Sequence, residues 1–87
     1  MIPLHVRPFF WEIDTASFDP RSYPRYTIGR ILELGNERAY SWLKEIFSEA
    51  EIKEVILHER RLTRRSANFW SLVYGLPRDT VAALSAQ

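Results

Sequence analysis

The chain has 87 residues, of which 46% are hydrophobic and 26% charged, with a formal net charge of +1. This length provides for one hydrophobic core, so we expect a single domain over residues 1–87. With this composition, neither a disordered chain nor a membrane protein is the default. The short apolar runs exclude a membrane-spanning helix, and the first residues lack the apolar region of a signal peptide. Without cysteine, disulfides and thiolate-bound zinc are excluded. We therefore expect a cytoplasmic protein without membrane contact.

Residues 1–18 predict an extended N-terminal arm. Two prolines oppose a helix there, and Ile2, Leu4 and Val6 alternate with polar residues as in an edge strand. The aromatic run 9–11 is too apolar for a free tail. We expect this run to anchor the arm on the helical body, which is predicted over residues 19–87.

The first helix of the body is predicted from its caps. Asp19 precedes a first-turn proline, Pro24 restarts or continues the helix, and Gly35 is placed to end it. Its apolar face is Ile28, Ile31 and Leu32. Asn36 then caps the second helix directly, without a linker. The apolar stripe predicted there is Ala39, Leu43, Ile46, Phe47 and Ala50.

A capping box starts the third helix, with Ser48 at the N-cap and Glu51 at the third helical position. Thr63 is placed to cap a fourth helix that Gly75 ends, and Pro77 opens a short last helix through Val81 and Leu84. The third helix is expected to bury Ile52, Val55, Ile56 and Leu62. The fourth is expected to bury Phe69, Trp70, Val73 and Leu76. The fold class is thus all-α: a compact bundle of four or five short helices with very short loops.

The sequence contains few residues in arrangements that could support catalysis. The only histidines are His5 and His58, and neither has the spacing of a zinc ligand pair or of a serine–histidine–acid set. The three glycines form no phosphate-binding loop. Glu12, Asp14 and Asp19 form an acidic cluster that is more typical of caps and solvated loops than of a cation site. We expect no enzyme, no catalytic residue, no metal and no cofactor.

A DNA-binding function fits the C-terminal half better. Residues 49–76 have the outline of a helix-turn-helix, whose second helix would present Arg64, Arg65 and Asn68 to base edges in the major groove. Arg60 and Arg61 precede that helix and would contact phosphates. The alternative is that Asn68 bridges locally and that these arginines pair within the domain with Glu51, Glu54 and Glu59.

Two tryptophans are candidates for a protein interface. Trp42 lies at the border of the apolar stripe of the second helix, and Trp11 lies beside the acidic cluster of the arm. An aromatic residue at a surface border with arginine nearby is typical of interaction hot spots.

The chain also resembles a known family. The segments that carry the resemblance are 10–14, 28–36, 42–43 and 61–70. Together they resemble a small prokaryotic domain of unknown function with a Phe-Trp-Asp start and an Arg-Leu-Ser…Asn-Phe-Trp finish, over about residues 9–78. Glu12 replaces the usual aspartate, and Gly29 stands where the family tends to have glutamate. The resemblance implies an antitoxin-like protein, since such domains are often encoded beside AbiEii-type nucleotidyltransferase toxins.

We therefore expect a non-enzymatic protein-binding module that neutralises a nucleotidyltransferase-type toxin. Carboxylates of the arm would occupy the basic cleft of the toxin as phosphate surrogates. The residues expected to contact the partner are Trp11, Glu12, Asp14, Asp19 and Trp42. The alternative function is a helix-turn-helix DNA-binding autoregulator, and a third is a structural subunit or homo-oligomer. The identity of the partner, DNA binding and the oligomeric state stay open at this point.

Overall fold

Capping side chains divide the chain into short helices, which a computed structural model describes over residues 2–85. The α-helices of this part are α1 (Pro24–Leu34), α2 (Glu37–Ile46), α3 (Glu49–His58), α4 (Arg64–Val73) and α5 (Ala82–Ser85). Three 3-10 turns complete it: η1 (Arg7–Phe10), η2 (Pro20–Ser22) and η3 (Arg78–Thr80). No strand occurs between residues 2 and 85. The prediction of an all-α bundle of four or five short helices is confirmed.

The three central helices begin where their N-cap residues predict. The Asn36 side chain accepts a hydrogen bond from the third residue of α2, and Thr63 does the same for α4. At α3, Ser48 Oγ accepts from the Glu51 backbone N–H at 3.1 Å, and Glu51 Oε1 accepts from the Ser48 N–H at 2.7 Å. Both hydrogen bonds of the predicted capping box are therefore present.

Replacing Ser48→Ala is expected to lower the free energy of unfolding by about 1 kcal/mol, because an N-terminal amide of α3 loses its acceptor. Urea denaturation measures this loss. Ser41→Ala is the matched control, since Ser41 is exposed within α2 and alanine favours a helix. An equal midpoint for the Ser48 variant and the wild type would contradict the assigned role of the cap.

Two glycines end helices for different reasons. Gly75 follows α4 with φ +65°, the left-handed conformation that glycine adopts without strain, and the next N–H, of Leu76, donates to the Ser71 carbonyl at 2.8 Å. Gly35 follows α1 with φ −76°, which any residue adopts. Here the reason is space, because a Cβ atom would lie 2.7 Å from the Ile31 carbonyl oxygen.

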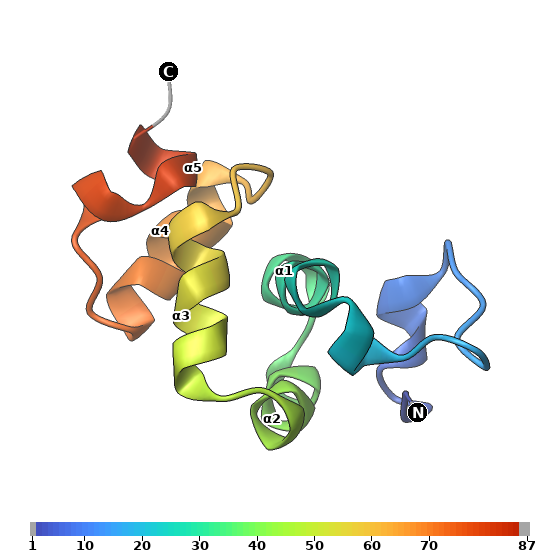
Figure 1. The fold of residues 1–87 in the computed structure, drawn as a ribbon. Coiled ribbons are helices and arrows are strands. Elements are labelled where there is room, and N and C mark those ends of the chain that lie inside the picture. Colours follow the sequence, from blue (N-terminus) through green and yellow to red (C-terminus); the bar gives the residue numbers. More distant parts are fainter. Residues whose placement is uncertain (1, 86–87) are drawn as a thin grey trace.

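Helix α1 is the centre of the molecule. It packs against α2, α3 and α4 and against both N-terminal 3-10 turns, while α5 covers α3 and α4. Figure 1 shows the N-terminal turns on one side of α1 and the helices α3 to α5 on the other, which gives an elongated body of 38 × 23 × 21 Å. Helix α1 itself contributes the buried residues Thr27, Ile28, Ile31 and Leu32.

The N-terminal arm is not extended, which corrects the prediction. Its prolines start turns: the Val6 N–H donates to the Pro3 carbonyl at 3.0 Å, and η1 follows. This coiling brings Ile2, Val6 and Phe10 to one side, where all three are fully buried, and leaves Leu4 outside. The alternating pattern was therefore misleading, because the spacing of the buried residues is four rather than two.

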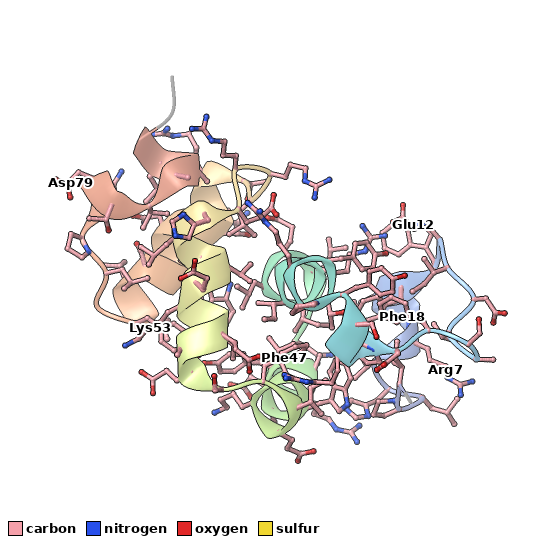
Figure 2. The ribbon with its side chains drawn as sticks, in the orientation of Figure 1. Arg7, Glu12, Phe18, Phe47, Lys53 and Asp79 are labelled. Atoms are coloured by element: carbon pink, nitrogen blue, oxygen red, sulfur yellow. The ribbon has the colours of Figure 1, made fainter. Side chains whose placement is uncertain are left out.

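Aromatic rings fix the arm on α1. The Phe10 ring lies 5.9 Å from the rings of Phe18 and Tyr26, and Figure 2 shows Phe18 between the arm and α1. The prediction that the run 9–11 anchors the arm is confirmed for Phe10, whereas Trp11 is 67% exposed.

The predicted inner side of α4 is only partly right: Trp70 and, just after the helix, Leu76 pack against the core. The buried residues of α4 are Ala67 and Ser71, and the half-buried Trp70 donates its indole N–H to the Leu32 carbonyl at 2.8 Å. Phe69 and Val73, which were expected inside, are exposed. Ala50, assigned to the stripe of the second helix, is likewise exposed in the first turn of α3.

Candidate functional site

Two of the three arm carboxylates are used in local turns. Asp14 Oδ1 accepts a hydrogen bond from the Ala16 N–H at 3.1 Å. Asp19 caps η2 by accepting from the Arg21 N–H at 3.1 Å and from the Ser22 hydroxyl at 2.9 Å. These acids therefore hold the backbone of the arm, as the sequence had suggested for caps.

The third arm carboxylate, Glu12, belongs to a clamp around Arg30. The Arg30 guanidinium pairs with Glu12 at 2.5 Å, and its Nε donates to the Phe9 carbonyl at 2.9 Å. The same guanidinium lies over the rings of Trp11, at 4.4 Å from the centroid, and Tyr26, at 5.4 Å. Arg30 on α1 thus fastens the arm by charge, hydrogen bonding and stacking.

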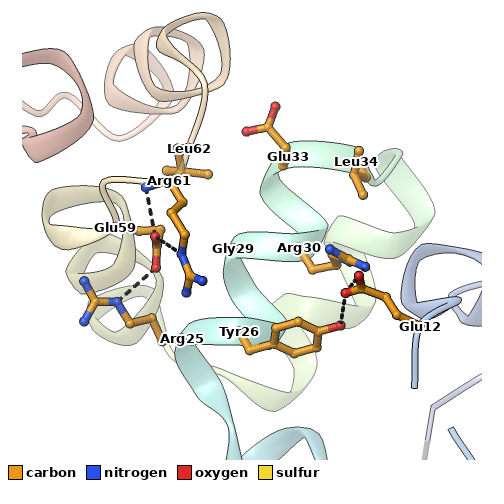
Figure 3. Close-up of a pocket in the computed structure, with 10 residues that line it drawn as sticks. All are labelled: Glu12, Arg25, Tyr26, Gly29, Arg30, Glu33, Leu34, Glu59, Arg61 and Leu62. Carbon is orange, nitrogen blue, oxygen red and sulfur yellow. Dashed lines mark hydrogen bonds and ion pairs between the residues drawn. The ribbon is translucent and has the colours of Figure 1, made fainter. Parts of the chain in front are cut away.

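A second ion-pair group lies on the other side of a cleft of about 350 Å³. The buried Glu59 carboxylate pairs with Arg25 Nε at 3.0 Å and accepts from the Arg61 backbone N–H at 2.9 Å and from Arg61 Nε at 3.1 Å. Figure 3 shows Gly29 between this group and the Glu12–Arg30 pair. The Glu12–Arg30 pair joins the arm to α1, and the Arg25–Glu59 pair joins α1 to the end of α3. The Arg61–Glu59 pair closes the turn after α3. The charged side chains on both sides of the cleft therefore hold separate segments of the fold together.

Burial raises the pKa of Glu59, but the backbone N–H and guanidinium of Arg61, together with Arg25, outweigh it and place the pKa below its ordinary value of 4.5. A carboxyl with a lowered pKa in the folded state stabilises the fold above its unfolded pKa, and this contribution is lost as the pH falls through the folded pKa.

We therefore expect the difference in unfolding free energy between wild type and Glu59→Gln to be largest near neutral pH. The difference should shrink as the pH falls from 4.5 through the lower pKa of the folded state, because Glu59 takes up a proton first in the unfolded chain and only at lower pH in the folded one. Urea denaturation over this pH range measures it, with Glu45→Gln as the control, since Glu45 is exposed and has no ion pair within residues 2–85. A difference that is independent of pH would contradict a paired, ionised Glu59.

Trp42 lies in the core. It is 7% exposed and is buried together with its neighbour Leu43. The interpretation as a border residue available to a partner is therefore wrong for this conformation. Trp42 is buried together with the stripe residues Ala39 and Leu43. The buried surface of α2 is therefore wider than the stripe that the spacing predicted.

The arginines of the α3–α4 turn divide into bound and unbound ones. Arg61 pairs with Glu59, Arg64 donates to the Leu84 carbonyl at 3.3 Å, and Asn68 Oδ1 accepts from Arg78 at 2.6 Å. Arg60 and Arg65 are exposed and have no acidic partner among residues 2–85. Of the ion pairs expected between these arginines and Glu51, Glu54 and Glu59, the pair with Glu59 is confirmed, since Arg61 contacts it. Glu51 instead pairs with Arg21, and Glu54 with His58.

The sequence did not predict the apolar surface on α4. Phe69 is 55% exposed, Leu72 70% and Val73 49%, and their i, i+3, i+4 spacing puts them on one side of the helix. We name this surface the α4 outer face. It was missed because large apolar side chains lie on two sides of α4: Trp70 packs against the core, whereas Phe69, Leu72 and Val73 face solvent. The sequence did contain one indication of this surface: α4 has more large apolar side chains than one buried side of a short helix can hold.

The sequence model of a family of unknown function (DUF6922) matches residues 6–56, more than half of the chain. The chain belongs to the DUF6922 family. The matched range contains the contacts of Arg30 with Phe9, Trp11 and Glu12, which we call the arm clamp. It also contains α1, α2 and most of α3, whereas α4 and the motif 61–70 lie beyond it. No curated protein and no solved structure matches this DUF6922 chain.

Two further findings concern the described part of the DUF6922 chain. Between residues 2 and 85, no helix has the length and apolar character needed to cross a membrane. In the same part, no three histidine, aspartate or glutamate side chains come together as a group that could hold a metal ion.

Proposed function

We propose that this DUF6922 chain is a non-enzymatic protein-binding module that contacts its partner through the α4 outer face. The observation that carries the proposal is the exposure of Phe69, Leu72 and Val73 side by side on one helix. Contiguous apolar patches of this kind are rare on a protein without partners, because they cost free energy in water. Burial against another protein removes that cost.

Protein binding has more support than DNA binding. Helix α4 would be the recognition helix of a helix-turn-helix, yet Arg64 and the Asn68 side chain are held by the C-terminal segment. The side of α4 that remains open presents Phe69 and Leu72, which have no hydrogen bond to offer a base edge. Within residues 2–85, Arg65 is the one free candidate for a base contact beside them.

The partner that we propose is a nucleotidyltransferase-type toxin, as the family resemblance implies, so the module would act as an antitoxin. Since Asp14 and Asp19 serve as local caps, we assign the main contact to α4 rather than to the acids of the arm. Trp11 and Glu12, at the exposed edge of the arm clamp, stay candidates for a secondary contact.

The test is co-expression of the chain with an AbiEii-type nucleotidyltransferase toxin, followed by affinity measurement on the purified proteins. Leu72→Asp is expected to weaken the complex at least about tenfold, because it would bury a charge in an apolar contact. Leu4→Asp is the matched control, since Leu4 is 76% exposed but lies on the arm.

Equal affinities for Leu72→Asp and the wild type would remove α4 from the interface. Absence of any complex with the wild-type chain would overturn the toxin as the partner.

A further inference from the structure

Granting the protein-binding function proposed above, we infer that the partner docks on α4 with an acidic, amphipathic α-helix. Its apolar side chains pack on the α4 outer face, and a carboxylate next to them pairs with Arg65. The inference rests on the proposed function in one respect, the use of α4 as the contact surface.

The shape beside α4 suits a helix. A groove runs between α4 and the end of α1, with Leu32 and Gly35 on one side and Phe69, Trp70 and Leu72 on the other. A helix can insert a row of side chains, spaced three and four residues apart, into a groove of this kind.

Two side chains of opposite charge line the groove, Arg65 and Glu33. The first turn of α4 contains Arg64 and Arg65 and no acidic residue, although the positive end of the helix dipole lies there. Within the described residues, Glu33 is the carboxylate that lines the groove. Its two oxygens accept from the Thr63 N–H at 3.0 Å and from the Thr63 hydroxyl at 2.9 Å. Arg65 is left exposed without an acidic partner in residues 2–85.

A second copy of the chain does not offer the matching surface. Its glutamate-rich helix is α3, where the apolar residues Ile52, Val55 and Ile56 are buried. The carboxylates of that helix are already paired within the chain: Glu49 with Lys53 at 3.1 Å, Glu51 with Arg21 at 3.0 Å and Glu54 with His58 at 3.2 Å. We therefore assign the complementary helix to a different protein, and association of two copies through α4 is an outcome of the test below.

The experiment uses two synthetic helical peptides with the same leucines at positions i, i+3 and i+7. One peptide carries glutamates beside the leucines, and the other carries lysines. Each is titrated into the full isotope-labelled chain, and amide chemical shifts are followed by NMR. The acidic peptide is expected to shift signals of α4 and the end of α1 and to bind at least about tenfold more tightly than the basic one.

Arg65→Glu is expected to abolish or reverse this preference. Arg60→Glu is the matched control, since Arg60 is also exposed but precedes α4, and it is expected to keep most of the preference.

Equal binding of the two peptides, shifts confined to another surface, or no binding of either would overturn the inference. Concentration-dependent dimerisation that Leu72→Asp abolishes would assign the face to a second copy and overturn it too. If Leu72→Asp still disrupts the toxin complex in these cases, the proposed function stands without the acidic helix. If Leu72→Asp leaves that complex intact, the proposed function itself fails.

Discussion

Replacing Phe10→Ala is expected to lower the free energy of unfolding by about 3–5 kcal/mol. The ring is fully buried and lies 5.9 Å from the rings of Phe18 and Tyr26, so its removal leaves a cavity between the arm and α1. For a domain of this size such a loss is a large part of the total stability. Chemical denaturation measures it.

Leu4→Ala is the matched control, because Leu4 lies in the same arm but is 76% exposed; we expect a change within about 0.5 kcal/mol. Hydrogen exchange of the Phe10→Ala variant would show whether the arm opens alone or with the helices. A loss below about 1 kcal/mol would mean that the arm adds little to the core, contrary to the burial of Ile2, Val6 and Phe10.

Two glycine substitutions are expected to have opposite effects. Gly35→Ala should destabilise the fold by about 1–3 kcal/mol, because its Cβ would lie 2.7 Å from the Ile31 carbonyl oxygen and 3.3 Å from the Ala39 Cβ. Gly29→Ala should stabilise it by up to about 1 kcal/mol, because Gly29 lies inside α1 and the nearest atom to its added Cβ is Glu59 Cγ at 3.9 Å.

Thermal and chemical unfolding of the two variants would measure the difference between them. Each variant serves as the control of the other, since both make the same chemical change in or next to the same helix. Stabilisation by Gly35→Ala would contradict the close approach of α1 and α2 at this glycine.

The helix boundaries could be predicted because their causes are local. A cap joins a side chain to a backbone amide a few residues away, so Asn36, Ser48 and Thr63 carried the information in the sequence itself. The orientation of α4 could not be read in this way. Apolar residues lie on two sides of that helix, and packing against α1, α3 and α5 decides which side is buried.

The candidate site was less predictable, because its contacts join distant residues. Arg30 on α1 contacts Phe9 and Glu12 of the arm, which are distant from it in the sequence. Glu59 likewise contacts Arg25, which belongs to another helix. Sequence spacing could not pair these charges. The arm showed the same limit, since its alternating apolar residues fitted a strand until the turns after its prolines were known.

The placement of the three tryptophans makes the domain readable by fluorescence. Trp11 is exposed under Arg30 on the arm, Trp42 is buried in α2, and Trp70 is half-buried in α4 with its indole N–H bonded to the Leu32 carbonyl. A water-soluble quencher reaches Trp11 first, whereas the emission of Trp42 changes only when the core opens. Quenching of Trp11 therefore reports on the arm, whereas the emission of Trp42 reports on the core.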